Sequence, residues 1–600
     1  MTVPEKLAAL CRRMEEEGVD VYLIPTGDDH SSEYAGDYYN CRAWLTGFTG
    51  SAGTAAVACT PQGMEAGLWT DGRYFIQAAR QLEGTGITLY RMGEPGVPTL
   101  AQWLETHLSR GGVLGYDGRV LPSAEVKCLS QALDGVILHR ELDLVGDIWA
   151  DRPARSCRKA WELDEAHAGR SRTDKLAQIR AEMAEQEADC LVLPALDDIA
   201  WLLNLRGDDV ACNPVVLAFA AVEPERVLLF AQPAAFDEAL QKRLAADGVE
   251  LAPYEEIYDY VKALPEGTAL WMDAAQAGDA LWNSVPADVL LLDEESPVRL
   301  HKACKNPTEL EEERRAHVKD GAALCRFLYW LKHRVGKEPI TECSAAEKLE
   351  QLRKEQPGYL GPSFETIAAY GAHGAIVHYA PTPETDIPLE PKGLFLVDSG
   401  GQYLAATTDV TRTIALGPVT DREREMFTLV LRSHLALGAV QFREGCRGDG
   451  LDVVARGPLW ECGLDFNHGT GHGVGCLLNV HEDPMRIRWR AMDGMPPFME
   501  GMVVSNEPGF YEEEAFGIRT ENLMACRKAV QNQYGTFLNF ETLTLAPIDL
   551  DAVDPAGLDE REKERLNQYH ARVYREIAPL LPPEEAPWLK NATRPIDRCA

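Results

Sequence analysis

A short pattern that occurs twice in the first half of the chain limits the possible folds more than any other feature. In each copy a charged stretch typical of a helix precedes an apolar stretch typical of a strand, over residues 4–17 then 19–24, and 174–187 then 191–193. At a constant offset of 169 residues, Asp20, Pro25, Asp28 and Asp29 correspond to Asp189, Pro194, Asp197 and Asp198. We therefore expect two related α/β domains in tandem, with Asp28, Asp29, Asp197 and Asp198 acting as turn formers.

The chain of 600 residues is long enough for three or four domains at about 150 residues each. Residues 286–307 form a connecting stretch, and Thr308-Glu309-Leu310-Glu311 resembles a capping box that begins a long helix ending near Gly336. A charged amphipathic stretch over 558–580 predicts a tail helix packed on the preceding region. The expected parts are residues 1–155, 156–305, 306–547 and 548–600.

Charge and cysteine content exclude several classes of protein. With 59 basic and 94 acidic side chains the net charge is −35, which disfavours binding to nucleic acid or anionic membranes. There is no run of about 18 apolar residues and no apolar signal-peptide core, so we expect no membrane span. The 15 cysteines are scattered, odd in number and without a Cys-x-x-Cys pair. We expect them to be reduced and mostly buried in a cytoplasmic protein.

Two acids of the third region accompany apolar, strand-like stretches. Residues 394–397 predict a buried strand with Asp398 at its end, and Asp409 lies within the next expected strand, 403–414. Adjacent strands would present both carboxylates to one point, and an isolated buried carboxylate is costly. Considered separately, Asp398 is more often a turn cap and Asp409 more often a solvent-facing acid.

Three more residues in the third region bear side chains suited to metal binding. His472 stands among four glycines in an expected loop, residues 469–475, whose glycine spacing fits neither Gly-x-Gly-x-x-Gly nor a P-loop. Glu507 precedes a Pro-Gly turn, and Glu521 follows a strand return; each alone is consistent with a surface acid. With Asp398 and Asp409 they make four carboxylates and one imidazole, whose mutual repulsion two divalent cations would relieve.

This set of ligands indicates the metal and the reaction class. Oxygen-rich ligation with one histidine suits Mn²⁺, Co²⁺ or Zn²⁺. Paired cations about 3.5–4 Å apart activate water and polarise a carbonyl, as peptide hydrolysis requires. Other hydrolytic signatures are missing, because residues 481–485 do not complete His-Glu-x-x-His and no Gly-x-Ser-x-Gly is present.

The third region resembles the pita-bread metallopeptidases, and the whole chain is similar to the three-domain, cytosolic type of Xaa-Pro aminopeptidase. The resemblance extends to the sequences at 25–28, 46–54, 197–207 and 566–570. It implies an α/β (α+β) fold, in which two tandem creatinase-N-like α/β domains precede a C-terminal pita-bread catalytic domain.

The resemblance also implies a role for each site residue. The metal ligands would be Asp398, Asp409, His472, Glu507 and Glu521, with Asp409 and Glu521 bridging two ions. His378 matches a substrate-binding histidine, and His481 matches one that contacts the scissile carbonyl or the tetrahedral intermediate. His468 matches a histidine on the proline side, and Arg519 an arginine beside the bridging glutamate.

The implied reaction is hydrolysis of the bond before a penultimate proline in peptides. A hydroxide held between two Mn²⁺ ions would attack the Xaa–Pro carbonyl, with His378, His481 and Glu507 as catalytic residues. Glu507 would orient or deprotonate the nucleophile, and His481 would stabilise the oxyanion. A homodimer is also implied.

Two alternatives remain open. A prolidase uses a similar metal cage but cleaves Xaa-Pro dipeptides; the chain length, the tandem domains and the tail favour the aminopeptidase. An inactive pita-bread module that binds peptides usually lacks metal ligands, whereas this chain has all five. The role of Arg206 is undecided by sequence.

Overall fold

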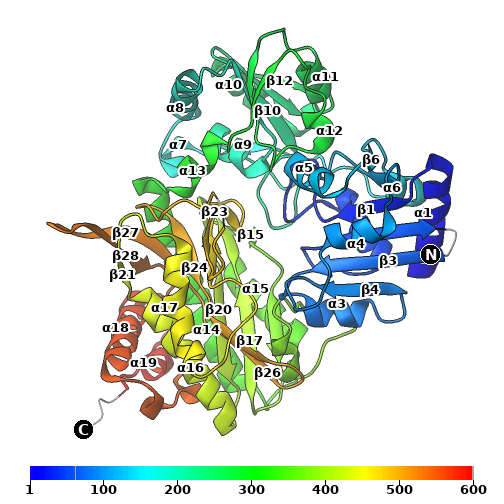
Figure 1. Cartoon of the computed structure of the whole chain (residues 1–600). Coiled ribbons are helices and arrows are strands. Elements are labelled where there is room, and N and C mark those ends of the chain that lie inside the picture. Colours follow the sequence, from blue (N-terminus) through cyan, green and yellow to red (C-terminus); the bar gives the residue numbers. More distant parts are fainter. Residues whose placement is uncertain (61–62, 493, 597–600) are drawn as a thin grey trace. The chain divides into compact units, whose positions relative to one another are not determined.

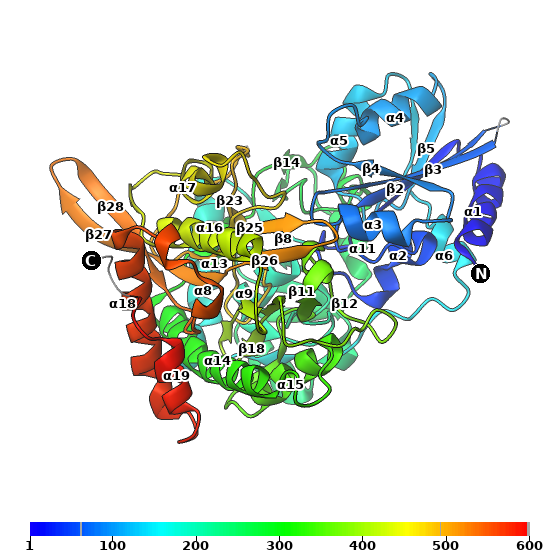
Figure 2. The same cartoon turned by 90° about the horizontal axis from the view of Figure 1, so that it is seen from below.

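The computed structural model describes residues 1–60, 63–492 and 494–596, and the chain forms two compact units (Figures 1 and 2). The first unit contains residues 1–163 and 170–298, and the second contains residues 164–169 and 299–600. Residues 597–600 of the expected tail lie outside the described residues. Among the described residues, no helix combines the length and the apolar character needed to cross a membrane.

The first unit holds two six-stranded sheets with the same topology. The first sheet has the order β4-β3-β2-β1-β5-β6 and the second β12-β11-β10-β8-β13-β14. In both, the first strand of the repeat pairs antiparallel with one neighbour and parallel with the other. The strands are β1 (Val21–Pro25), β2 (Thr54–Thr60), β3 (Gly63–Thr70), β4 (Ile87–Arg91), β5 (Val113–Tyr116), β6 (Ile137–His139), β8 (Cys190–Leu193), β10 (Ala218–Val222), β11 (Val227–Ala231), β12 (Val249–Pro253), β13 (Ala269–Trp271) and β14 (Leu290–Leu292). This repetition confirms the predicted pair of related α/β domains.

One acid of the repeated pattern has the same structural role in both domains. The carboxylate of Asp20 accepts the backbone N–H of Val113 at 2.8 Å, and that of Asp189 accepts the N–H of Ala269 at 2.9 Å. Each aspartate directly precedes the first strand of its domain and binds the start of the parallel neighbour, β5 or β13. The recurrence of this residue therefore reflects a shared hydrogen bond.

The expectation that the other repeated acids are turn formers is only partly correct. Asp28 accepts the backbone N–H groups of two residues in its turn, His30 and Ser32, at 2.9 Å each. Asp29 instead forms a buried ion pair with Arg155 at 3.3 Å. Asp197 and Asp198 lie in the first turn of helix α9 (Leu196–Leu203), where the helix dipole favours acids.

Sequence left the role of Arg206 undecided. In the structure its side chain is buried in the second α/β domain. Its Nη1 donates to the carbonyl oxygens of Ala200 and Leu205 at 2.9 Å each. Because α9 ends at Leu203, these bonds join the helix to strand β9 (Leu205–Arg206). The arginine therefore supports the local backbone.

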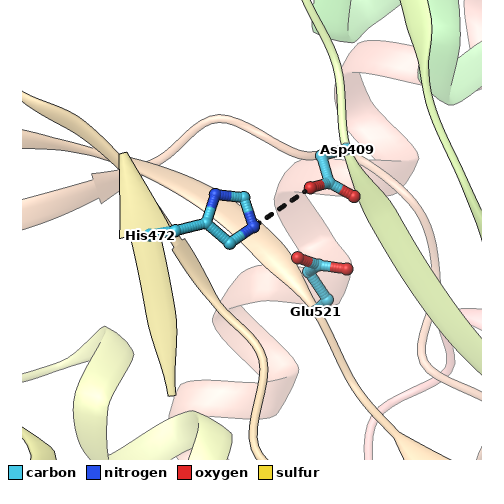
Figure 3. A group of neighbouring side chains, drawn as sticks. All are labelled: Asp409, His472 and Glu521. Carbon is cyan, nitrogen blue, oxygen red and sulfur yellow. Dashed lines mark ion pairs between the residues drawn. The ribbon is translucent and has the colours of Figure 1, made fainter. Parts of the chain in front are cut away.

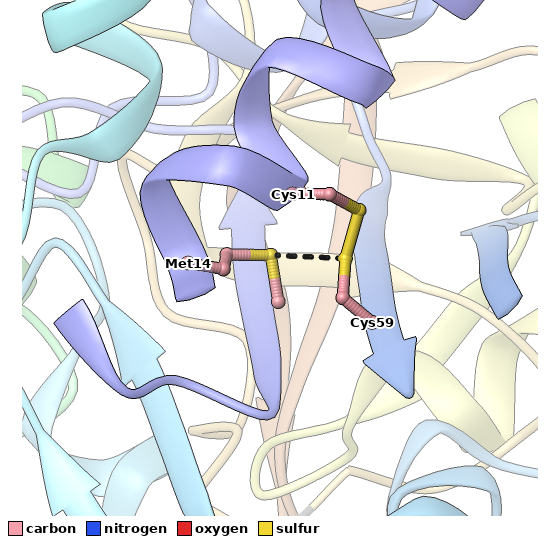
Figure 4. The surroundings of a disulfide bond; sticks show 3 residues. All are labelled: Cys11, Met14 and Cys59. Atoms are coloured by element: carbon pink, nitrogen blue, oxygen red, sulfur yellow. Dashed lines mark hydrogen bonds between the residues drawn. A yellow bond between two sulfur atoms is a disulfide. The ribbon is translucent and has the colours of Figure 1, made fainter. Parts of the chain in front are cut away.

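A disulfide corrects the expectation that all cysteines are reduced. Helix α1 (Val3–Glu17) packs against β2, which brings Cys11 and Cys59 to a Cα–Cα distance of 5.9 Å, within the usual disulfide range. Figure 4 shows the bond between the two sulfur atoms, with Met14 beside it. A sequence separation of 48 residues concealed this pairing.

The second unit begins with the long helix α14 (Pro307–Arg334). The predicted start is close, but the capping residue is Asn306 rather than Thr308. The Asn306 side chain accepts the N–H groups of Thr308 and Glu309, and the Glu309 carboxylate accepts the N–H of Asn306. Pro307 at the first helical position has no N–H, so the cap falls one residue before it.

Four sheets and further helices lie in this unit. The smallest sheet pairs β25 (Gly509–Glu512) with β26 (Phe516–Arg519). The three larger sheets have the orders β16-β17-β20, β15-β18-β19 and β21-β28-β27-β24-β22-β23. Their strands are β15 (Tyr359–Pro362), β16 (Ile367–Tyr370), β17 (Leu394–Ser399), β18 (Gly401–Tyr403), β19 (Ala406–Thr407), β20 (Val410–Ala415), β21 (Gln441–Arg443), β22 (Gly471–Gly473), β23 (Glu482–Ile487), β24 (Val503–Asn506), β27 (Asn522–Asn532) and β28 (Gly535–Thr542). The helices are α15 (Glu342–Lys354), α16 (Asp421–Gly438), α17 (Gly448–Trp460), α18 (Glu560–Ile577) and α19 (Ala586–Ala592).

Two predicted segments differ from the structure. The single strand expected over 403–414 is interrupted, because β18 and β19 form a hairpin that turns at Ala405, where φ is 66°. Asp409 therefore precedes β20 rather than lying inside a strand. The glycine-rich segment expected as a loop contains strand β22.

In the tail, α18 and α19 lie against α14 (Figure 2), with Val573 and Leu589 in a core shared with Cys325.

Candidate metal centre

Neighbouring strands present the two aspartates to one place. Asp398 lies in β17 and pairs in register with Thr411 of β20, the strand that begins directly after Asp409. Because β17 and β20 are antiparallel, the end of one strand lies beside the start of the other. The pairing places the two carboxylates near each other, although Asp409 lies just before its strand and not within it.

The two glutamates are placed by a second pair of antiparallel strands. Asn506, the last residue of β24, pairs with Asn522, the first residue of β27. Glu507 and Glu521 adjoin these paired residues at the same end of the ladder. Glu521 also donates its backbone N–H to the carbonyl oxygen of Thr411, which ties this ladder to the aspartate-bearing sheet.

Glycines position His472 between two strands. A Cβ atom added to Gly471 would lie 2.1 Å from the carbonyl oxygen of Ser505, and one added to Gly473 would lie 2.3 Å from that of Glu482. The alternating glycines thus allow β22 to pack closely between β24 and β23. Nδ1 of His472 lies 2.9 Å from the carbonyl oxygen of Gly473, so Nδ1 must be the donor and Nε2 is left as the metal-binding nitrogen.

The side chains of Asp409, His472 and Glu521 face one another (Figure 3). One ligand atom from each lies within 4.8 Å of the others. Nε2 of His472 is 3.5 Å from Oδ2 of Asp409 and 3.3 Å from Oε1 of Glu507. Side chains from four separate segments therefore converge on one buried point.

The electrostatics of this cluster favour divalent cations. Burial, and then the charge of Asp398, raises the pKa of Asp409 to about 8. Burial and neighbouring carboxylates also raise the pKa of Glu507 and Glu521. Oδ1 of Asp398 is buried without a hydrogen-bond partner. The site thus contains carboxylates that repel one another, one carboxylate oxygen without a partner and one correctly oriented imidazole. This donor set fits two divalent cations.

A hydrogen-bond network surrounds these ligands. Arg519 donates from Nη2 to Oδ2 of Asp398 at 2.6 Å, from Nη1 to the Tyr511 hydroxyl at 2.7 Å and from Nε to Thr411 Oγ1 at 3.2 Å. Thr411 donates in turn to Oε2 of Glu521 at 2.6 Å. Ser505 Oγ accepts the N–H of His472 and donates to Glu507 at 3.1 Å. Sequence reasoning missed Thr411, Tyr511 and Ser505, because hydroxyl residues in strands carry no distinctive spacing.

The three other histidines identified from sequence are placed differently. The ring of His481 lies 4.4 Å from that of His472, and Nε2 of His468 lies 2.7 Å from the Tyr511 hydroxyl. His378 is tied to the site through its backbone neighbour Val377, whose carbonyl oxygen accepts a hydrogen bond from Arg519 at 3.3 Å.

A buried ion pair supports the segment that carries His481. Glu482, the next residue, accepts a hydrogen bond from Nζ of Lys305, and each side chain is 1% exposed. Lys305 lies just before the cap of α14, and its backbone N–H donates to Gly501. The pair therefore connects the start of the second unit to the histidine segment.

Comparison with known proteins assigns a family to each part of the chain. Residues 6–145 and 151–309 match the creatinase/prolidase N-terminal domain, residues 311–528 match metallopeptidase family M24, and residues 536–596 match the C-terminal region of that peptidase family. Aminopeptidase P2 of Arabidopsis thaliana is 39% identical over 640 residues, covering 99% of this chain and 89% of that protein. A probable Xaa-Pro aminopeptidase P of Laccaria bicolor is 39% identical over 607 residues, covering 99% and 93%.

A solved structure agrees in fold over the whole length. The X-prolyl aminopeptidase of Caenorhabditis elegans, described as a cytosolic enzyme with a di-nuclear active site, superposes with a TM-score of 0.94. Its sequence is 35% identical to this one, and the match covers 99% of this chain and 100% of that chain.

Proposed function

The chain belongs to metallopeptidase family M24, and we propose on that premise that it is a metal-dependent Xaa-Pro aminopeptidase, which removes the residue before a penultimate proline. The observation that carries this function is the intact donor set of Asp398, Asp409, His472, Glu507 and Glu521 in a chain similar over its whole length to such enzymes. An inactive peptide-binding module is disfavoured because this set is complete.

The five donors would hold two divalent cations, with Asp409 and Glu521 shared between them. We favour Mn²⁺ over Co²⁺ or Zn²⁺, because four carboxylates and one imidazole make an oxygen-rich site. When bound, the cations supply Lewis acidity and lower the pKa of water. Glu507 is suited to accept a proton from the attacking water, since its Oε1 is oriented by Ser505 at the edge of the cluster.

The three histidines and Arg519 are proposed to bind and position the substrate. His481, whose ring adjoins His472, is placed to donate a hydrogen bond to the carbonyl oxygen as negative charge develops there, an effect worth about 3–4 kcal/mol in comparable sites. His378 and His468 would bind the peptide on either side of the scissile bond. Arg519 holds Asp398 and the Tyr511 hydroxyl, which in turn contacts His468.

Peptide hydrolysis tests the function and separates it from prolidase activity. The metal-stripped protein is assayed with and without Mn²⁺ on an Xaa-Pro-Yaa tripeptide, an Xaa-Pro dipeptide and an Xaa-Ala-Yaa tripeptide. Mn²⁺-dependent release of the first residue from the proline tripeptide alone is expected, because proline lacks the N–H that ordinary peptidases bind. Preference for the dipeptide would indicate a prolidase, and absence of turnover with metal bound would refute the enzyme function.

We also propose a homodimer in the cytoplasm. Trp460 at the end of α17 and Trp489 after β23 are 40% and 46% exposed, and their rings lie 6.4 Å apart. Paired exposed tryptophans are typical of a surface that a partner covers. Light scattering should show a dimer that Trp460→Glu dissociates, whereas Tyr534→Glu at another exposed site leaves it intact. The cytoplasmic location is supported by the description of the nematode enzyme as cytosolic.

The division into residues 1–155, 156–305, 306–547 and 548–600 is part of the same proposal. Limited proteolysis should cut first near these boundaries, because linkers between domains are the most accessible backbone. Early cuts inside either six-stranded sheet of the first unit would contradict this division into domains.

A further inference from the structure

We propose that a basic cleft beside the C-terminal end of α14, formed by residues other than the metal ligands, binds a small polyphosphate anion. The cleft, here called the α14 cleft, has a volume of about 380 Å³. Its walls include Tyr329, Trp330 and Arg334 near the end of α14, Lys337 beyond it, and Lys348 on α15. Such a volume is in the range of small-molecule sites.

The charge of the α14 cleft contrasts with that of the whole chain. The net charge of the protein is −35, yet Arg334, Lys337 and Lys348 all line this one hollow. Within the described residues, none of these three cations forms an ion pair. Three cations that line one hollow without an ion-pair partner repel one another, and a bound anion would reduce that repulsion.

The helix dipole explains only part of this concentration of charge. Basic residues are favoured in the last turn of a helix, which accounts for Arg334 in α14. Lys337 lies beyond the helix and Lys348 lies within α15, so the dipole of α14 does not explain either. The positions of Lys337 and Lys348 in this cleft therefore need an explanation other than the dipole of α14.

The acid in the cleft does not cancel the positive charge. Glu585 lines the same hollow, but it lies 3.7 Å from Arg326, another lining residue. Arg326 also pairs with Glu355 outside the cleft. One arginine and two glutamates carry a net charge of −1, so together with Arg334, Lys337 and Lys348 the residues in and beside the cleft keep a net charge of +2 for a ligand.

The side chains around the cleft indicate which anion would bind. The guanidinium of Arg334 binds two oxygens of one phosphate, and the lysines add point charges for further phosphates. Trp330 supplies half-buried aromatic surface in the same hollow, against which a planar ring would stack, whereas the ring of Tyr329 is packed against His333 with centroids 4.2 Å apart. A nucleoside triphosphate would use both features, and inorganic tripolyphosphate would use the cations alone.

Calorimetric titration of the Mn²⁺-loaded full-length protein tests the proposal. Inorganic tripolyphosphate and a nucleoside triphosphate are titrated at about 20 mM and about 200 mM salt, because ionic contacts weaken as salt rises. The test variant is Arg334→Glu/Lys337→Glu. The matched control, Arg110→Glu/Lys242→Glu, makes the same charge change at exposed positions that do not line the cleft.

The test variant should bind both phosphates at least about tenfold more weakly, and the control should bind as wild type does. Trp330→Ala should weaken the nucleoside triphosphate more than tripolyphosphate. Equal binding by the test variant and wild type would mean that the phosphates bind outside the α14 cleft, and would overturn the proposal. So would absence of binding at the lower salt concentration, or binding of an acidic peptide in place of either phosphate.

Discussion

Arg519 binds one oxygen of Asp398 and leaves the other oxygen of that carboxylate without a hydrogen-bond partner. The bond from Nη2 to Oδ2 is 2.6 Å long, and the arginine is only 1% exposed. The carboxylate is thus held in one orientation, with Oδ1 available to a cation. A residue that touches no cation can therefore control the geometry of the metal site.

Arg519→Lys is expected to weaken metal binding by about 10–100-fold, because residues that orient ligands typically contribute this much. Lysine keeps the charge but cannot contact Asp398, Tyr511 and Thr411 at once. Competition with a chelator measures the affinity. Arg527→Lys, at a partly exposed ion pair with Glu541, is the control and should leave metal affinity unchanged. Equal affinities in both variants would contradict the role given to Arg519.

Tyr511→Phe removes the hydroxyl that joins Arg519 to His468 through two contacts of 2.7 Å. We expect kcat/KM for the proline tripeptide to fall about tenfold, since a buried hydrogen bond to a charged group is worth about 1.5–3 kcal/mol. Bound metal should remain, because Tyr511 is not a ligand. Tyr534→Phe at an exposed position is the control. Loss of metal from Tyr511→Phe would show that the tyrosine instead supports the cation site.

Stability of the metal-free protein should fall as pH rises. The pKa of Asp409 is raised to about 8 by burial and by Asp398. A raised carboxyl pKa stabilises the fold fully below the unfolded value of about 4, and that contribution is lost as pH rises through the folded value. Mn²⁺ should therefore increase Tm more at about pH 8 than at about pH 6, because fewer protons then compete for the ligands. An increase in Tm that does not depend on pH would contradict this.

Lys305→Met should destabilise the second unit by about 3–5 kcal/mol, because it leaves Glu482 buried without its cation. The double variant Lys305→Met/Glu482→Gln should recover much of this loss, since neither charge remains. Denaturant unfolding of the single and double variants measures the coupling. Additive effects would show that the two side chains do not interact.

Removal of the Cys11–Cys59 disulfide should lower stability by up to about 4 kcal/mol, on the basis of the 48-residue separation that it closes. Cys11→Ser/Cys59→Ser makes the change, and Cys128→Ser at an exposed free thiol is the control. Thiol titration of the unfolded protein should show two more thiols after reduction than before. No increase would mean that the bond does not form.

Much of the architecture could be predicted because it depends on local patterns. The recurring Asp20 and Asp189 indicated a duplicated domain, and a Pro-Gly turn after Glu507 marked the return to Glu521. The site residues were identifiable by type, since few other side chains bind divalent cations. Each acid by itself was consistent with a surface position, and only their occurrence together with His472 in one region indicated a metal site.

The remaining features depend on contacts between distant residues. The Cys11–Cys59 pair exists because α1 packs against β2, which sequence separation does not reveal. Thr411 and Tyr511 became recognisable only when the strands were placed around Arg519. The break before Asp409 arises because the chain turns at Ala405, although the surrounding residues favour continuous strand.

The duplicated sheets of the first unit allow one hydrogen bond to be compared at two equivalent positions within the same molecule. Asp20→Asn and Asp189→Asn remove equivalent carboxylates, one bound to Val113 and the other to Ala269. Any difference between their effects must come from the surroundings, because the hydrogen bond and the strand order are the same. One polypeptide can thus report how strongly context modifies the contribution of a single interaction, without comparison between species.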